Sequence, residues 1–436
     1  MLVMLMKLSK YNFFKRYNDS MVFFNAATSA LAITDETFLR VVDDIKNNCF
    51  EETKYDAKLI KDMKNSGCIV NDDVDELERL EFYRNLAKYD VTNLDLTIAP
   101  TLDCNFRCKY CFETHPKGIM SNDIQASLLK FVEEKLEGVK NFSVTWYGGE
   151  PLSAKGVVYS LSEKFLELCT KKHVKYDALI ITNASLMDES DIEKFKRYKI
   201  NRVQVTIDGP KEIHDQRRRC VTGESTYDKL IENVNSLLNN NLSVSIRVNI
   251  DKENIDNVDE LLQDISTRID RYKNLNIRFG KVSPLTEICK SIEENCYSYE
   301  QFADVMLSLY RKVAKYGLKI SRKMIYPMVR VNYCGCADCI NSFVVDNNGF
   351  LYKCWNDVGN EKNSCGNVND FRIEENYIKS IQWNPIRINK CRECQYLPVC
   401  MGGCPNVAKQ TGEPVCGTIK YNLDKVLECY YYKLRG

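Results

Sequence analysis

Histidine is scarce in this chain, with three among 436 residues. Three are too few for a metal site built mainly from imidazoles, or for assuming an acid–base histidine. An excess of one charge sign is also lacking: 61 Lys and Arg stand against 60 Asp and Glu, for a net charge of +1. Nucleic-acid binding normally leaves a basic patch or stripe, so this balance predicts no nucleic-acid partner.

Long apolar runs are missing as well. No segment approaches the ~20 apolar residues that a membrane-spanning helix needs, so we expect no membrane partner. The opening run MLVMLM stops at Lys7 and is too short for the apolar core of a signal peptide. We therefore expect a cytoplasmic protein whose thiols stay reduced.

Cysteine, by contrast, is abundant, with 20 residues. Disulfide-rich secreted proteins are normally small, whereas this chain is long enough for two or three domains. We therefore expect many of these thiols to bind iron.

The most informative stretch is 101–112, TLDCNFRCKYCF, which follows an apolar run over 94–100. It places Cys104, Cys108 and Cys111 in a C-x3-C-x2-C spacing. Cysteine thiolates are the usual ligands of four-iron clusters, and three of them leave one iron open. An open position distinguishes catalytic from structural metal sites. From the spacing alone, the alternative is a structural zinc loop with its fourth ligand elsewhere.

This motif, with Tyr110 before its last cysteine and Tyr-Gly-Gly-Glu-Pro over 147–151, resembles the radical S-adenosylmethionine (radical SAM) enzymes. The resemblance extends from about residue 91 to the C-terminus. It implies that the open iron binds the amino and carboxylate groups of SAM. It further implies that one-electron reduction releases a 5′-deoxyadenosyl radical, which takes hydrogen from a substrate. A one-electron reductant, such as flavodoxin or ferredoxin, is then a required partner.

The residues from Leu94 to about Met324 alternate between strand-like runs and amphipathic stretches. Strands are expected at 94–100, 142–146, 178–182, 202–207, 243–250 and 275–279. Six such units predict an α/β fold with a parallel sheet, and the resemblance implies a partial (β/α)6 barrel over 91–325. Ligands bind at the carboxyl ends of such strands, so the cysteine loop and Gly148-Gly149-Glu150 should converge on one site.

Several residues at these strand ends are candidates for contacts with the cofactor. Gly148 and Gly149 allow close approach of the backbone to a ligand, and Glu150 can accept from an ammonium group. The resemblance implies that this motif meets the SAM amino group. It also assigns Asn183 and Arg247, together with Tyr110 of the iron motif, to SAM binding. For these positions the alternative is a turn or a solvated strand end.

A further signature, DGP…HD-x-x-R, is found in related maturases. Its residues here are Asp208, Gly209, Pro210, His214, Asp215 and Arg218. Arg247 and Asn249, which end the fifth strand, resemble the family positions that hold the methionyl carboxylate and the ribose of SAM. The sequence does not identify a catalytic base among them.

Eleven cysteines lie between Cys334 and Cys429, in a spacing that resembles the SPASM extension of radical SAM enzymes acting on peptides and proteins. The resemblance implies a cysteine-rich domain over 326–436 that holds two auxiliary four-iron clusters, three clusters in all. The first would use Cys339, Cys354 and Cys404 with either Cys334 or Cys336. The second would use Cys391, Cys394, Cys400 and Cys416. A pair of zinc sites is the alternative.

Residues 1–90 carry no iron motif. Their pattern predicts strands at 10–17, 21–26 and 68–70 and helices at 38–45, 56–65 and 74–88. This content fits a small winged-helix-like domain, with which many radical SAM enzymes of ribosomal peptides begin. That position implies recognition of a leader peptide by β-augmentation, in which the peptide adds a strand to a sheet edge. The alternative is a structural cap on the barrel.

Together these patterns predict a radical SAM maturase that oxidatively crosslinks residues of a ribosomally made precursor peptide, through a thioether or a carbon–carbon bond. One alternative is an anaerobic sulfatase-maturing enzyme, which oxidises Cys or Ser to formylglycine. Its iron motif typically lies near the N-terminus, unlike the motif here. Another is a non-catalytic iron–sulfur electron carrier, which needs neither an open iron nor Glu150.

Overall fold

The computed structural model describes residues 6–269, 273–320 and 325–435. Most of the opening apolar run and Met324, where the alternation of strands and helices was expected to end, lie outside them. Contacts group the chain into two compact units. We call them the sheet unit, 89–321 with 335–382, and the terminal unit, 1–88 with 322–334 and 383–436. Domain boundaries at 90 and 325 stay a prediction. The described residues include no helix long and apolar enough to cross a membrane.

The sheet unit is built on one sheet in the order β13-β12-β10-β9-β8-β6-β14-β15. Its six expected strands are present and parallel: β6 (Asn93–Ile98), β8 (Asn141–Trp146), β9 (Lys175–Thr182), β10 (Ile200–Thr206), β12 (Ser243–Ile250) and β13 (Leu275–Lys281). The predicted α/β class is confirmed. Two strands were not expected: β14 (Ser342–Val345), parallel to β6, and β15 (Leu351–Tyr352), antiparallel to β14.

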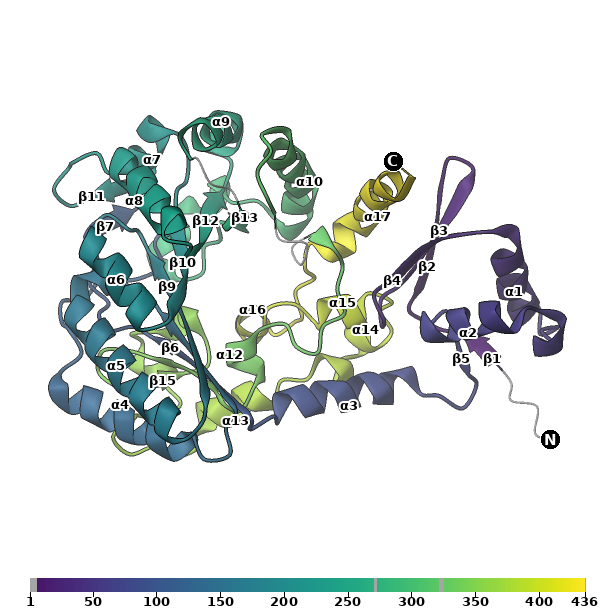
Figure 1. Ribbon diagram of the computed structural model, residues 1–436. Coiled ribbons are helices and arrows are strands. Elements are labelled where there is room, and N and C mark those ends of the chain that lie inside the picture. The colour runs from purple at the N-terminus through teal and green to yellow at the C-terminus, as the bar shows by residue number, and fades with distance from the viewer. Residues whose placement is uncertain (1–5, 270–272, 321–324, 436) are drawn as a thin grey trace. The chain divides into compact units, whose positions relative to one another are not determined.

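Helices cover one face of this sheet (Figure 1). They are α4 (Asn122–Lys135), α5 (Lys155–Lys171), α6 (Glu189–Arg197), α8 (Tyr227–Asn239), α9 (Val258–Arg268) and α10 (Tyr299–Lys315). In β9 and β12 every second residue is buried, and the residues between are half-buried apart from the exposed first residue of each strand. This two-residue period packs one face against the helices and turns the other face inward, where β12 carries Arg247 and Asn249. Side chains of that inner face are therefore available to a site.

Shorter elements complete the sheet unit. These are α7 (Lys211–Arg217), α12 (Gly335–Asp338), α13 (Glu375–Gln382) and a two-stranded sheet of β7 (Phe106–Cys108) with β11 (Arg218–Cys220). The β7–β11 pair matters most, because β7 lies inside the cysteine motif.

The terminal unit contains an antiparallel sheet of β2 (Asn12–Tyr17), β3 (Ser20–Asn25) and β4 (Ala30–Thr34). It continues with α1 (Glu36–Lys46), α2 (Ala57–Asn65), α3 (Glu76–Lys88) and β1 (Met6–Leu8) paired with β5 (Ile69–Asn71). Its C-terminal part holds α14 (Asn389–Arg392), α15 (Leu397–Cys400), α16 (Pro405–Thr411) and α17 (Ile419–Arg435). The strands and helices expected over 1–90 are present, and β1 and β4 add to them.

The N-terminal residues of this unit share a hydrophobic core with its C-terminal residues. Tyr11, Phe13 and Phe24 are buried in one cluster with Leu397 and Leu427. The Lys15 ammonium pairs with the Asp424 carboxylate at 2.8 Å. Burial of this much apolar surface is the main stabilising term in folding. Removing residues 1–90 would therefore expose the core beneath the C-terminal cysteines.

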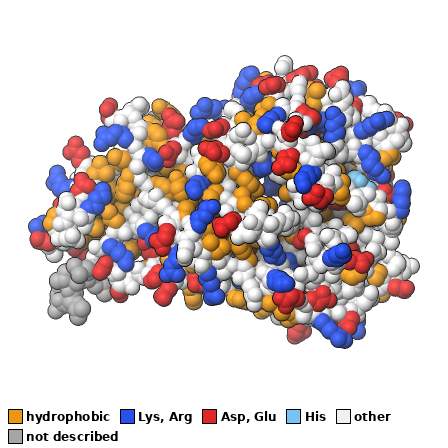
Figure 2. All heavy atoms as spheres, turned by 180° about the vertical axis from the view of Figure 1, so that it is seen from behind, with side chains coloured by type: hydrophobic (Ala, Val, Ile, Leu, Met, Phe, Trp, Pro, Cys, Tyr) orange, Lys and Arg blue, Asp and Glu red, His pale blue; other side chains and the backbone are white. Residues whose placement is uncertain are grey.

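Charged side chains are mixed in sign over the surface. Figure 2 shows Lys and Arg interspersed with Asp and Glu on the face that it presents, as the net charge of +1 leads one to expect.

Candidate active site

A cavity of about 320 Å³ opens in the sheet unit beside the carboxyl ends of the parallel strands. Its walls include the cysteine loop after β6, the glycine loop after β8 and residues at the ends of β9, β10, β12 and β13. The structure thus brings together the predicted residues Cys104, Cys108, Cys111, Tyr110, Gly148, Gly149, Glu150, Asn183 and Arg247. The expected convergence of these two loops on one site is observed.

The three thiols of the cysteine loop line this cavity and are free of disulfides. Burial raises the pKa of Cys108 and raises that of Cys111 to about 12. Buried thiols of this kind stay protonated unless positive charge compensates the thiolate. A coordinated metal supplies that charge and deprotonates the thiol outright. The donor set therefore fits a metal cluster.

The glycine loop packs directly on the cysteine loop. The N–H groups of Gly149 and Glu150 donate to the carbonyls of Thr101 and Asp103, at 3.2 and 3.0 Å. A Cβ at Gly149 would lie 2.3 Å from the carbonyl oxygen of Asp103. Gly148 has a φ of 108°, a conformation that other residues rarely adopt. Only glycines allow the two loops to meet this closely.

The Glu150 side chain is buried behind the glycine loop and ties it to β9. Its Oε1 accepts from the Thr182 hydroxyl at 2.6 Å and from the Leu152 N–H at 3.0 Å. Its Oε2 accepts from the Asn183 N–H at 2.7 Å. Burial raises the pKa of Glu150, and these donors oppose the increase. A carboxylate has about four lone-pair sites, so capacity for one further donor remains.

Asn183, just after the end of β9, is hydrogen-bonded to the cysteine loop. Its Nδ2 donates to Asn105 Oδ1 at 2.9 Å, and its Oδ1 accepts from the Ser185 hydroxyl at 2.7 Å. These contacts orient the loop, and the expected contact of Asn183 with SAM stays a prediction.

Arg247 extends into the cavity from β12, and a neighbouring glycine makes room for it. Its Nε donates to Asn249 Oδ1 at 2.7 Å. On β13 a Cβ at Gly280 would lie 2.2 Å from a terminal nitrogen of the Arg247 guanidinium. The position of this guanidinium therefore depends on Gly280, which sequence reasoning did not single out.

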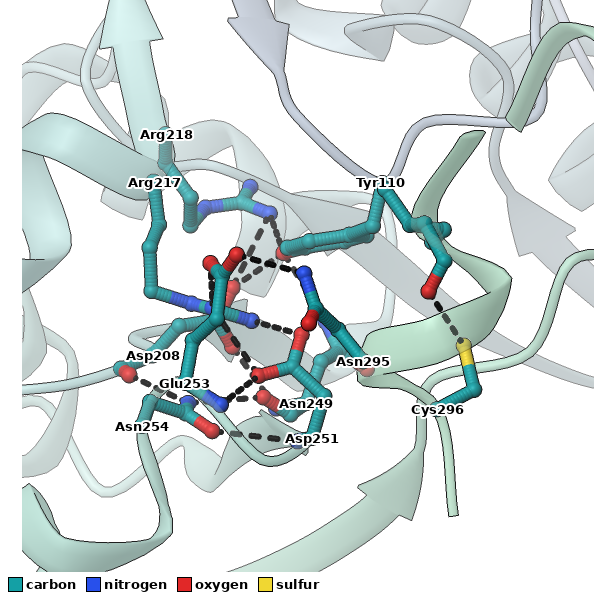
Figure 3. Close-up of polar contacts among 11 residues, drawn as sticks. Tyr110, Asp208, Arg217, Arg218, Asn249, Asp251, Glu253, Asn254, Asn295 and Cys296 are labelled. Atoms are coloured by element: carbon teal, nitrogen blue, oxygen red, sulfur yellow. Dashed lines mark hydrogen bonds and ion pairs between the residues drawn. The ribbon is translucent and has the colours of Figure 1, made fainter. Parts of the chain in front are cut away.

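The Tyr110 hydroxyl lies in a polar network formed by the DGP…HD-x-x-R signature (Figure 3). It donates to Asp208 and accepts from Arg218 at 2.6 Å and from Asn249 Nδ2 at 3.1 Å. Asp208 also accepts from the Asn249 N–H at 2.7 Å. The network joins the cysteine loop to β10, β11 and β12.

His214 of the same signature lies behind this network. Its Nδ1 accepts from the Asp208 N–H at 3.3 Å, and its side chain is fully buried. Burial lowers the pKa of His214 well below its usual value, so the ring is neutral. We assign it a structural role in the DGP turn.

The cavity also contains charged residues that sequence reasoning missed. Glu113 lies just after the last cysteine of the loop, where burial raises its pKa to about 7 despite a hydrogen bond with Tyr147. Lys281 ends β13 and donates to the Tyr297 carbonyl at 3.0 Å. The only sequence signal for Glu113 is its closeness to Cys111, and Lys281 carries none.

The terminal unit has a cysteine cavity of its own. It is lined by Cys391, Cys394, Cys400 and Cys416, the four thiols predicted to share the second auxiliary cluster. Burial raises the pKa of Cys391 to about 11. The Lys420 ammonium lies 3.5 Å from Cys416 Sγ. This local geometry suits a cluster bound by four thiolates.

The cysteines predicted for the first auxiliary cluster are divided by the two units. Cys336, Cys339 and Cys354 belong to the sheet unit, and Cys334 and Cys404 to the terminal unit. The Trp355 indole donates to Cys336 Sγ at 3.3 Å. This cluster, and the choice between Cys334 and Cys336, stay predictions.

In the described part of the chain, no three His, Cys, Asp or Glu side chains are placed to hold one metal ion. A four-iron cluster does not require such convergence, because each thiolate binds a different iron.

Comparison with known families identifies the domain around this cavity. The radical SAM superfamily matches residues 98–265, which include the cysteine loop, the glycine loop and strands up to β12. The chain carries a radical SAM domain. Such a domain uses an iron–sulfur cluster and SAM, and the free thiols and packed glycine loop fit both.

Among curated relatives, the radical SAM cyclopropyl synthase TigE of Paramaledivibacter caminithermalis is 23% identical over 469 residues, covering 98% of this chain and 94% of its own length. A cysteine-type anaerobic sulfatase-maturating enzyme of Clostridium novyi is 24% identical over 366 residues, covering 76% of this chain and 95% of its own.

Two solved structures have a fold similar to that of this chain. SuiB of Streptococcus suis, bound to its precursor peptide SuiA, has a TM-score of 0.56 at 15% identity and covers 95% of this chain and 98% of its own. The enzyme anSMEcpe with bound AdoMet has a TM-score of 0.60 at 22% identity and covers 78% of this chain and 97% of its own.

Proposed function

We propose that this radical SAM enzyme oxidatively crosslinks residues of a ribosomally made precursor peptide. The supporting observation is coverage: TigE and SuiB match this chain over 98% and 95% of its length. The sulfatase-maturating relative and anSMEcpe match 76% and 78%. SuiB is seen with a precursor peptide, and TigE is named a radical SAM cyclopropyl synthase. Peptide binding and bond formation are thus the activities proposed for this chain.

Cys104, Cys108 and Cys111 are proposed to hold the cluster that binds SAM, and eight of the C-terminal cysteines to hold two auxiliary clusters. When bound, the cluster and SAM supply a radical able to remove hydrogen from the substrate. Glu150 would accept from the SAM amino group through its remaining lone pair. Arg247 would pair with the SAM carboxylate, because a guanidinium matches that geometry. A one-electron reductant, such as flavodoxin or ferredoxin, completes the system.

A sulfatase-maturing activity is the second candidate, since the relative from Clostridium novyi, 24% identical to this chain, is named for that activity. The two candidates differ in product. A crosslink joins two residues, whereas formylglycine is an aldehyde on one residue.

The test is an anaerobic reaction of the reconstituted enzyme with the peptide encoded by a short reading frame beside its gene. We expect the tandem mass spectrum to lack fragment ions from backbone cleavage between the two linked residues, because the crosslink keeps those fragments together. A product that reacts with a hydrazide probe would identify an aldehyde and favour the sulfatase-maturing candidate. A sulfatase gene as neighbour would point the same way.

Substituting Gly280 with alanine is expected to weaken SAM binding about tenfold, which is about 1.4 kcal/mol. The new Cβ would lie 2.2 Å from the Arg247 guanidinium, which must then move out of the cavity. Isothermal titration of the anaerobic enzyme with SAM measures the effect.

Gly156→Ala is the matched control, since a Cβ at Gly156 meets no atom within 4 Å. Both variants should keep the iron content of the parent enzyme. If Gly280→Ala binds SAM with unchanged affinity, Arg247 is not part of the proposed SAM site.

A proline that removes an outward N–H of β4 is expected to weaken binding of the leader peptide at least tenfold. In the described sheet β4 pairs with β3 and forms an edge, where an added peptide strand would pair with outward N–H groups. Successive residues alternate in direction, so proline is placed at Ala32 and at Ile33 in separate variants. Full-length enzyme is used because residues 1–90 share their core with the C-terminal part.

Fluorescence anisotropy with a labelled leader peptide measures this binding. Ala32→Ser and Ile33→Thr keep the N–H and serve as controls. If both proline variants fold, retain iron and bind the leader as the parent does, β4 is not the docking edge.

A further inference from the structure

Arg218 of the DGP…HD-x-x-R signature lies directly across from a cluster cysteine. In the β7–β11 sheet, Arg218 is paired with Cys108, and Arg219 with Arg107. The pairing continues on both sides, because the Lys109 N–H donates to the Arg217 carbonyl at 3.1 Å and the Val221 N–H to the Asn105 carbonyl at 2.9 Å. The backbone therefore fixes Arg218 beside the cysteine loop.

The side chain of Arg218 is buried, and Figure 3 shows it pointing toward Tyr110 and Asp208. One terminal nitrogen donates to the Tyr110 hydroxyl at 2.6 Å and lies 3.8 Å from Asp208 Oδ2. The guanidinium carbon lies 5.7 Å from the centre of the Phe106 ring. Both Arg218 and Cys108 line the cavity.

The groups around this guanidinium are the Tyr110 hydroxyl, the Asp208 carboxylate and, across the strand pair, the Cys108 thiol. Residues directly opposite each other in an antiparallel pair place their side chains on the same face, and Arg218 and Cys108 line the same cavity. A fixed positive charge thus acts on the thiol from which a cluster ligand is made.

We propose that the positive charge of Arg218 raises the reduction potential of the cluster held by Cys104, Cys108 and Cys111. The inference rests on the assignment of these three ligands proposed above. Reduction adds one electron, and the added negative charge is stabilised by a nearby cation in a medium of low dielectric constant. The Asp208 carboxylate should lower the reduction potential, because it places a negative charge beside the same guanidinium.

The signs of these two effects distinguish an electrostatic role from a merely structural one. Removing the positive charge with Arg218→Gln should lower the midpoint potential of the cluster. Removing the negative charge with Asp208→Asn should raise it. If Arg218 and Asp208 only held β11 against the cysteine loop, both variants would lose iron, and their midpoint potentials would not shift in opposite directions.

The experiment is an anaerobic potentiometric titration of the reconstituted enzyme, followed by electron paramagnetic resonance. The signal that changes when SAM is added identifies the cluster with the open iron. We expect Arg218→Gln to reduce the equilibrium constant of one-electron reduction at least tenfold, a shift of about 59 mV. Arg218→Lys keeps the positive charge, so its midpoint potential should lie closer to that of the parent enzyme than the potential of Arg218→Gln does.

Arg219→Gln is the matched control. Arg219 is the exposed neighbour on the same strand, where solvent screens its charge, so its removal should leave the potential unchanged. Shifts of opposite sign in Arg218→Gln and Asp208→Asn support the proposal, and any other pattern in these two overturns it. If Arg218→Gln does not retain the cluster, a higher potential in Asp208→Asn supports the proposal, and an unchanged or lower one overturns it. Absence of any SAM-responsive signal in the parent enzyme would instead refute the ligand assignment.

Discussion

Replacing Cys104, Cys108 and Cys111 together with alanine is expected to remove about a third of the iron and abolish SAM cleavage. Three four-iron clusters would give roughly twelve irons per chain, of which this loop would hold four. The loop lies in the sheet unit, and the second set of four thiols lines a separate cavity in the terminal unit. Iron analysis and assay of 5′-deoxyadenosine after anaerobic reconstitution measure both effects.

Cys169→Ala is the control for this experiment, because Cys169 is buried in α5 and lines neither cavity. Its iron content and SAM cleavage should equal those of the parent. Full iron content in the triple variant, or zinc in place of iron in anaerobically purified protein, would contradict the assignment.

Replacing Cys416 with alanine is expected to leave formation of 5′-deoxyadenosine largely intact while product falls at least tenfold. A crosslink removes two hydrogens from the substrate. The radical takes one hydrogen atom, and the second leaves as a proton and an electron, so an electron acceptor is required. A cluster held by Cys391, Cys394, Cys400 and Cys416 would supply that acceptor.

Cys429→Ala on α17 tests whether loss of any cysteine in the terminal unit has this effect, since Cys429 does not line the cysteine cavity. It should behave as the parent does. Equal losses of deoxyadenosine and product in Cys416→Ala would show that these thiols serve the fold rather than the oxidation.

The features that sequence reasoning found are those encoded locally. Each of the six parallel strands is a segment of six to eight residues in which apolar residues recur mostly at every second position. The cysteine motif and the glycine loop are also short segments that follow such strands. Their convergence follows from the rule that parallel strands end at one edge of the sheet.

The features it missed depend on contacts between distant segments. Strands β14 and β15 have only four and two residues, too few for a period to be recognised. The pairing of Arg218 with Cys108 joins residues far apart in sequence, and each lies in a three-residue strand. Gly280 carries no motif, and its role appears only when Arg247 is placed beside it.

The hydrophobic core that the N-terminal and C-terminal residues of the terminal unit share could not be predicted from the sequence, for the same reason. The Gln395 side chain donates to the Asn12 carbonyl, 383 residues away in the chain. Apolar residues at helical or strand spacing reveal that a face is buried, but not which segment covers it. The strands near the N-terminus were predicted, and their C-terminal neighbours were not.

The central claim, oxidative crosslinking of a peptide by this radical SAM enzyme, is tested most directly by one measurement. Intact mass of the peptide product and the amount of 5′-deoxyadenosine are determined in the same anaerobic reaction. The proposed chemistry predicts a product lighter by two hydrogens, with one deoxyadenosine formed for each crosslink. A modified product of unchanged mass, as in epimerisation, or a product lighter by two hydrogens that reacts with a hydrazide probe, would contradict it.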